Sequence, residues 1–302
     1  MLLEEQIRRN DRKTIFLLII FVAILSLIGL AIGSWWGSDI GGLLFALIIA
    51  VIYCLICISQ GKNMVMSLTH ARKIEKSDNP FLWNTVEGIS ISAGVPMPEV
   101  YIVDTDVPNA FATGYKQSNA AVAVTSGILN RLSREELEGV IAHEMSHVRN
   151  RDIRTSTIVV ALGGVLIILS RLFLRMGFYS GYGRRNSRNR KDDNDGLGAI
   201  LLIFSLIFAI LAPIISSLIQ AAISRQREFQ ADATAAQLTG YPEGLASALE
   251  KISEYEISEK QKNDLGGKEL MGLYISNPFA EGRNLLATHP PTEERIQRLR
   301  SM

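Results

Sequence analysis

The residues best suited to chemistry in this 302-residue sequence form the run His143-Glu144-Met145-Ser146-His147. Its H-E-x-x-H pattern places the two histidines four residues apart, so on a helix both imidazoles lie on one face. Two imidazoles at that spacing can bind a single Zn²⁺ ion, with the carboxylate of Glu144 beside it. This arrangement favours metal-assisted hydrolysis. The plainer alternative is two histidines on the face of a soluble helix.

A catalytic zinc needs a third protein ligand, and the sequence offers a carboxylate for it. His70 follows an apolar block without an acidic neighbour, whereas Glu228 follows two arginines where another apolar block ends. Asp232 lies one helical turn after Glu228, on the same face. Glu228 could then bind the metal while Asp232 accepts a hydrogen bond from a ligand imidazole. Taken alone, this acidic pair is more typical of a solvated helix face.

Local signals predict the elements that would position these residues. Ser133 and Glu136 form a capping box, so a helix should begin at Arg134 and run through at least Val148. Proline and glycine positions predict further helices at 80–93, 242–255 and 292–299. Three β-branched or alternating runs should form strands of a small sheet: Val100–Val103, Ala110–Thr113 and Ala121–Thr125.

Two uncharged apolar blocks near the N-terminus, 15–32 and 40–61, are long enough, or nearly so, to cross about 30 Å of hydrocarbon. The basic residues ahead of the first block would also fit a cleaved signal peptide. Because a second block follows at once, we expect a retained anchor. Lys and Arg at both outer ends, and none in the turn at 34–39, predict that both ends of this hairpin are cytoplasmic.

Two more apolar blocks follow the histidine motif, a marginal one at 155–170 and a longer one at 196–224. If both span, the basic loop between them lies outside, against the positive-inside rule; if neither spans, they must re-enter or pack. We expect a spanning hairpin because of the length of the second block. Both metal-binding halves must reach one ion, so the chain has to return to the side that it left.

The expected fold class is α+β: an integral membrane protein, mainly helical, with a domain that carries a small β-sheet and the H-E-x-x-H helix. The expected parts are a basic cytoplasmic N-terminus (1–14), a transmembrane hairpin (15–61), a half-domain with the sheet and the histidine helix (62–154), a second hydrophobic hairpin (155–224) with a mobile loop (177–195), and a C-terminal half-domain (225–302).

Composition excludes other classes of function. A net charge of +1 is not that of a nucleic-acid-binding protein, so no nucleic-acid partner is expected. Cys54 and Cys57 form a C-x-x-C pattern, but they lie inside an apolar block without polar partners. We interpret them as packing residues rather than as a redox or zinc motif.

Several motifs together resemble one family. They are the H-E-x-x-H run, the later Glu228-Phe229-Gln230-Ala231-Asp232, the flanking spans and the upstream Asn109-Ala110-Phe111-Ala112-Thr113-Gly114. The combination resembles the HtpX family of membrane zinc metallopeptidases, which is related to the CAAX prenyl endopeptidases. The likeness extends to Thr288-His289-Pro290-Pro291 and so covers nearly the whole chain.

This resemblance implies one Zn²⁺ per chain, held by His143, His147 and Glu228, with Glu144 as the general base of peptide hydrolysis. It further implies misfolded or damaged membrane proteins as substrates, within protein quality control and the stress response. The site would face the cytoplasm of a bacterium from a multi-pass protein in the cytoplasmic membrane.

The resemblance also implies a substrate-binding strand. Asn109, Ala110 and Phe111 would lie on an exposed strand edge that pairs with the substrate backbone. His289 either packs a turn or donates a hydrogen bond to the oxyanion that forms during hydrolysis.

Spacing along the chain places the metal close to the bilayer. Glu228 follows Ile223, the last clearly apolar residue of its block, by about 7–8 Å of helix. This closeness favours membrane-protein substrates. Two alternatives stay open: a non-enzymatic membrane scaffold or transporter that has kept a metallopeptidase-like domain, and a prenyl-protein endopeptidase, which would typically have more spans.

Overall fold

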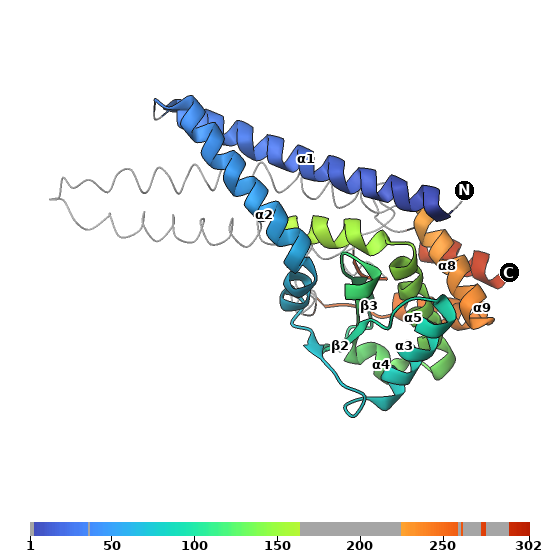
Figure 1. Ribbon diagram of the computed structural model, residues 1–302. Helices are drawn as coiled ribbons and strands as arrows, with labels where there is room; N and C mark the ends of the chain where they lie inside the picture. Colours follow the sequence, from blue (N-terminus) through green and yellow to red (C-terminus); the bar gives the residue numbers. More distant parts are fainter. Residues whose placement is uncertain (1–2, 36, 164–224, 259–260, 262–272, 276–289) are drawn as a thin grey trace.

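The computed structural model describes residues 3–35, 37–163, 225–258, 261, 273–275 and 290–302. It confirms the α+β class, because the described chain is mainly helical and contains one small mixed sheet (Figure 1). The choice between spanning and re-entry for 155–224, with its loop 177–195, concerns residues that lie almost entirely outside the described part. Only the start of that segment is described, in the helical stretch 152–163.

A long helical hairpin begins the fold and extends away from the rest of the molecule (Figure 1). It consists of α1 (Leu3–Trp35) and α2 (Asp39–Leu68). Near the tip the two backbones approach so closely that a Cβ on Gly42 would lie 2.2 Å from the carbonyl oxygen of Gly29. Both helices contain stretches long and apolar enough to cross a membrane, Asn10–Leu30 and Asp39–Leu68. Helix α1 thus starts well before the apolar block and includes the basic N-terminal residues.

The sheet has four strands in the order β1-β2-β4-β3, formed by Arg72–Lys73, Glu99–Val103, Ala121–Thr125 and Ala110–Thr113. The pair β2 and β4 is parallel, whereas β1 pairs with β2 and β3 pairs with β4 in antiparallel fashion. The bounds of β3 and β4 are those expected from the sequence. The two-residue strand β1 was not expected, since it is too short and too exposed to show an alternating pattern.

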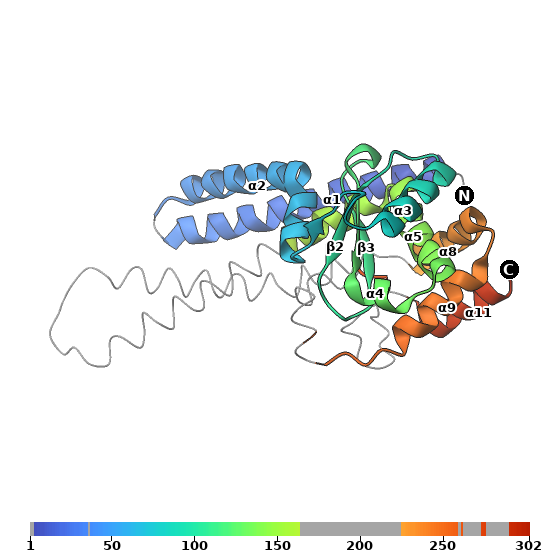
Figure 2. The same ribbon diagram turned by 90° about the horizontal axis from the view of Figure 1, so that it is seen from below.

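Helices from both halves of the chain pack around this sheet, and Figure 2 shows α5, α8, α9 and α11 gathered to one side of it. The first half provides α3 (Pro80–Ala93), the 3-10 turn η1 (Gln117–Asn119), α4 (Ser126–Arg131) and α5 (Arg134–Arg149). The second provides α8 (Arg225–Thr239), α9 (Pro242–Ser253) and α11 (Thr292–Arg300). One buried hydrophobic core contains residues of both halves, so the two fold as a single unit.

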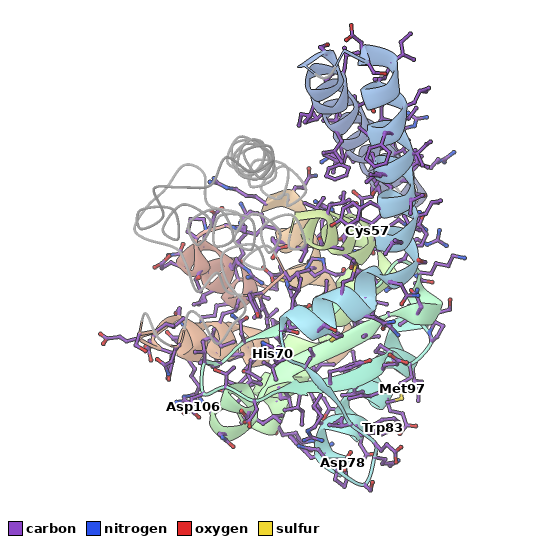
Figure 3. All side chains as sticks on the ribbon, turned by 90° about the vertical axis from the view of Figure 1, so that its left-hand side faces the viewer. Cys57, His70, Asp78, Trp83, Met97 and Asp106 are labelled. Carbon is purple, nitrogen blue, oxygen red and sulfur yellow. The ribbon has the colours of Figure 1, made fainter. Side chains whose placement is uncertain are left out.

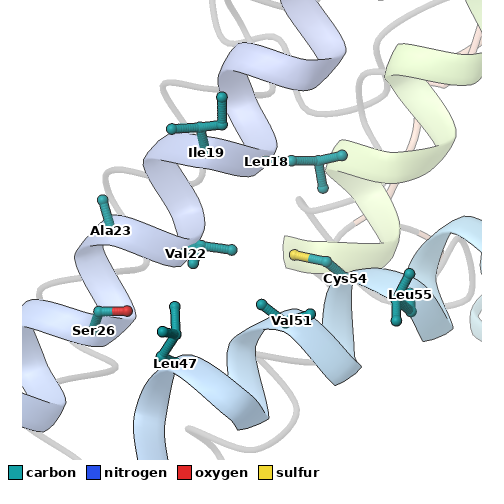
Figure 4. Close-up of a pocket in the computed structure, with 9 residues that line it drawn as sticks. All are labelled: Leu18, Ile19, Val22, Ala23, Ser26, Leu47, Val51, Cys54 and Leu55. Carbon is teal, nitrogen blue, oxygen red and sulfur yellow. The ribbon is translucent and has the colours of Figure 1, made fainter. Parts of the chain in front are cut away.

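The interior of the hairpin is apolar. A groove of about 400 Å³ lies between α1 and α2, lined mainly by aliphatic side chains together with Ser26 and Cys54 (Figure 4). Cys54 and Cys57 are buried and not joined by a disulfide. Both pack against the helical stretch 152–163, near which Figure 3 labels Cys57. These contacts agree with the packing role expected for the two cysteines.

Candidate metal centre

Helix α5 presents the two histidines of the motif. The capping box is formed as expected, because the Ser133 hydroxyl accepts from the Glu136 amide and the Glu136 carboxylate accepts from the Ser133 amide. The imidazoles of His143 and His147 stand nearly perpendicular, and their Nε2 atoms lie 3.2 Å apart. Two nitrogens bound tetrahedrally to one Zn²⁺ would be about 3.3 Å apart. The helix therefore holds this pair at the separation that a shared zinc ion requires.

Helix α8 brings the carboxylate of Glu228 to the same point. Its oxygens lie 3.7 Å from Nε2 of His143 and 3.6 Å from Nε2 of His147. One potential ligand atom from each of the three residues falls within a group no more than 4.8 Å across. Glu228 is 5% exposed. Two imidazole nitrogens and a carboxylate that meet at one point have the donor chemistry of a metal site.

Two aspartates orient the imidazoles from the other side. Nδ1 of His143 lies 2.9 Å from Oδ1 of Asp232, as the sequence predicted, and Nδ1 of His147 lies 3.2 Å from Oδ2 of Asp152. A carboxylate at Nδ1 favours the tautomer with its proton there, which leaves the Nε2 lone pair free for a metal. Asp152 was not expected, because it follows the end of α5 through a turn in which Arg151 has a φ of +58°.

A buried arginine completes the charge balance. Arg295 of α11 is 1% exposed and binds Asp232 through two hydrogen bonds, of 2.9 Å from Nε and 2.7 Å from Nη2. Its Nη1 donates to the carbonyl of Ile275 over 3.1 Å. Although burial alone raises the pKa of Asp232, the guanidinium holds it well below its ordinary value, at about 2. Nothing near Arg295 in the sequence predicted this role, because its partners lie on other elements.

The two histidines differ in their proton affinity. Burial lowers the pKa of His143 to about 4, so this imidazole is neutral at physiological pH. Burial also tends to lower the pKa of His147, but the hydrogen bond to Asp152 and the charge of Glu228 outweigh it and raise the pKa to about 9. A metal ion that binds Nε2 of His147 therefore has to displace a proton.

Glu144 lies on α5 beside the cluster and is 2% exposed. Burial raises the pKa of its carboxyl to about 7, with a further contribution from the negative charge of Glu228. The imidazole of His147 and a hydrogen bond from the backbone of Ala112 act in the opposite direction. Glu144 thus lies against β3 and has a proton affinity that suits both uptake and release near neutral pH.

Asn109, Ala110 and Phe111 were expected on an exposed strand edge, but all three are buried, so that part of the expectation is wrong. These residues are 1%, 0% and 1% exposed, although β3 is an edge strand of the described sheet. The amide of Ile275 donates to the carbonyl of Ala110 over 3.0 Å, and the ring of Tyr274 packs edge-on against Phe111 at 5.5 Å between centroids. The segment 273–275 therefore covers this end of β3. Substrate binding there stays a prediction, and His289 lies outside the described residues.

Comparisons with known proteins agree on the family. The family described as "Peptidase family M48" matches residues 76–302. Three relatives, each described as "Protease HtpX homolog", are 48% identical in Streptococcus gordonii, 46% in Listeria monocytogenes and 46% in Lactobacillus helveticus. Each comparison covers 100% of this chain and 100% of the relative.

A search of solved structures finds Ste24p of S. mikatae at 21% identity, with a TM-score of 0.49 over 98% of this chain and 66% of that chain.

Proposed function

Because the chain belongs to peptidase family M48 and gathers two imidazoles and a carboxylate around one point, we propose that it is a zinc-dependent endopeptidase. The convergence of His143, His147 and Glu228 is the observation that carries this proposal. Two nitrogen donors and one carboxylate form a ligand set that suits a catalytic zinc and leaves one position open.

When bound by these residues, Zn²⁺ would supply a water of lowered pKa and would polarise the scissile carbonyl. Glu144, buried on α5 beside the cluster, accepts the proton of the attacking water and returns it to the leaving amine. Asp232 and Asp152 keep the two imidazoles turned toward the metal. The peptide bond is hydrolysed without a covalent enzyme intermediate.

The proposal is tested by metal content and cleavage together. Full-length protein purified in detergent should bind one Zn²⁺ per chain and should cut an unfolded membrane protein internally. A strong chelator should abolish cleavage, and added Zn²⁺ should restore it. Mass spectrometry of the products and elemental analysis are the measurements. A protein that binds no zinc, or that cleaves equally well after the metal is removed, contradicts the proposal.

We further propose membrane proteins, in particular misfolded or damaged ones, as the substrates. Two observations support this. Relatives that match over the full length are named HtpX homologs. A candidate membrane span begins at Asn10, whose side chain contacts Asp152, the carboxylate beside His147. A site beside the bilayer has ready access to loops and tails of membrane proteins. Protein quality control in a bacterial cytoplasmic membrane is the role that we propose.

The proposed orientation, with the metal centre in the cytoplasm, can be tested with two single cysteines. Ser38 lies in the turn between α1 and α2. Ser77 lies beside Asp78, which Figure 3 labels at the end of the molecule opposite the helical hairpin, and both serines are exposed. In intact cells, an impermeant maleimide should label Ser38→Cys but not Ser77→Cys, and it should label both after lysis. The buried Cys54 and Cys57 keep the background low. The opposite pattern contradicts the orientation.

A further inference from the structure

The N-terminal end of α1 is bonded to the start of the helical stretch that follows α5, and Figure 1 shows the two running side by side. The hydroxyls of Thr14 and Thr155 lie 2.8 Å apart, and Asp11 forms an ion pair with Arg154. One turn earlier on α1, Nδ2 of Asn10 donates to Oδ1 of Asp152 over 2.5 Å. These contacts join residues about 140 positions apart in the chain.

The contact of Asn10 differs from the others because Asp152 also faces the metal centre. Oδ2 of Asp152 lies 3.2 Å from Nδ1 of His147, so one carboxylate joins the helix of the hairpin to a candidate metal ligand. Asn10 and Asp152 are 5% and 6% exposed. Nη1 of Arg227 lies 3.5 Å from Oδ1 of Asp152 and 3.5 Å from Oδ1 of Asn10, and Arg227 is next to Glu228 on α8.

We infer that Asn10, at the start of the first candidate membrane span, is a positioning residue for His147 and acts through Asp152. This inference rests on the proposed zinc function. The amide of Asn10 fixes one oxygen of Asp152, so the other oxygen stays directed at Nδ1 of His147. Without that amide, the guanidinium of Arg227 still lies 3.5 Å from Oδ1 of Asp152, and a shift of Asp152 toward it would weaken the contact of Asp152 with the imidazole.

The backbone just before Asp152 has an unfavourable conformation. The residue before it, Arg151, has a φ of +58°, a left-handed conformation that is unfavourable for a side chain with a Cβ. Backbone hydrogen bonds within the turn hold it, and the contacts of Asp152 and Arg154 with α1 add to them. Helix α1 is thus a structural part of the metal centre. Displacing its N-terminal end would move Asp152 and weaken the contact of Asp152 with His147.

Asn10→Ala in the full-length protein tests the inference through zinc affinity. Loss of a group that supports a ligand typically lowers metal affinity by about 10–100-fold, and we expect about tenfold because Asn10 acts one step further out. Affinity is measured by competition with a chelator, and Co²⁺ absorption reports the ligand geometry, which should change. Thr14→Val is the matched control on the same helix. It removes the hydroxyl that contacts Thr155 and donates to the backbone carbonyl of Asn10, but it leaves the side-chain amide of Asn10 on Asp152, so its zinc affinity and spectrum should be those of the wild type.

A double-mutant cycle separates positioning from general destabilisation. In an Asp152→Ala background, Asn10→Ala should lower the zinc affinity no further, because the residue through which it acts is absent. Should Asn10→Ala fail to fold, Asn10→Ser provides a shorter side chain that cannot keep the amide contact, and it is measured in the same cycle. Melting temperatures of the metal-free variants report folding.

Three results overturn the inference: wild-type affinity in Asn10→Ala, an equal loss in Thr14→Val, or an undiminished effect in the Asp152→Ala background. Each of these leaves the proposed function standing. If the wild-type protein binds no zinc, the proposed function fails, and the inference fails with it.

Discussion

Replacing Glu144 by glutamine should leave zinc bound while slowing peptide hydrolysis by about 10²–10⁴-fold, the usual contribution of a general base. The amide has almost the shape of the carboxylate, and its oxygen can still accept the hydrogen bond from the backbone of Ala112. It cannot take a proton from the attacking water. The expected loss is therefore in the turnover rate, whereas metal content and folding should be unchanged.

Folding should tolerate this change because Glu144 is only 2% exposed and burial makes its ionised form unfavourable. A neutral amide avoids that cost. The rate is measured with purified, zinc-loaded protein and a fluorescent peptide or an unfolded membrane protein. Glu138→Gln is the matched control: it makes the same substitution on the same helix, at a residue whose partner is Arg134 rather than the metal centre.

One outcome contradicts the role of Glu144 in proton transfer, and another contradicts the expectation that zinc stays bound. If Glu144→Gln turns over substrate at a rate close to that of Glu138→Gln, another group must accept the proton. If the variant loses its zinc, its inactivity says nothing about proton transfer, and the carboxylate instead contributes to holding the metal.

The parts of the fold that the sequence predicted are those with local causes. The capping box at Ser133 places the start of α5 correctly, and Asn79 caps α3 by accepting from the amide of Leu82, ahead of Pro80. Each signal lies within three residues of the helix end that it determines. The H-E-x-x-H spacing is equally local, because one turn of helix is enough to bring His143 and His147 together.

The parts that could not be predicted depend on residues far apart in sequence. Arg295 reaches Asp232 across 63 positions, and Asn10 reaches Asp152 across 142. Their side chains give no local sign of burial, and charged residues are most often exposed. The error at β3 has the same origin: the family resemblance implied an exposed edge, but whether the segment at Ile275 covers that edge depends on how a distant part of the chain folds back.

Arg295 is the residue for which this long-range dependence should have the largest energetic effect. Arg295→Met should destabilise the folded protein by about 3–5 kcal/mol, the typical cost of leaving one member of a buried ion pair without its partner. The substitution leaves the carboxylate of Asp232, 2% exposed, without its two hydrogen bonds from the guanidinium. The measurement is the unfolding of the metal-free protein in detergent, by heat or denaturant.

The matched control is Arg298→Met on the same helix. Arg298 pairs with Glu294 at the surface and lies over the ring of Phe229, so its loss should cost at most about 1 kcal/mol. Equal destabilisation by the two variants would contradict the special role of Arg295.

Adding Asp232→Asn to Arg295→Met should recover much of the lost stability, because a neutral amide does not need the guanidinium. It should at the same time lower the zinc affinity, since a neutral amide is a weaker acceptor for Nδ1 of His143 than the carboxylate, which now lies 2.9 Å away. Loss of such an outer partner typically lowers affinity by about 10–100-fold. Recovered stability with unchanged zinc affinity would mean that Asp232 serves the fold alone, whereas recovered stability with lowered zinc affinity separates its two roles: neutralising Arg295 and orienting His143.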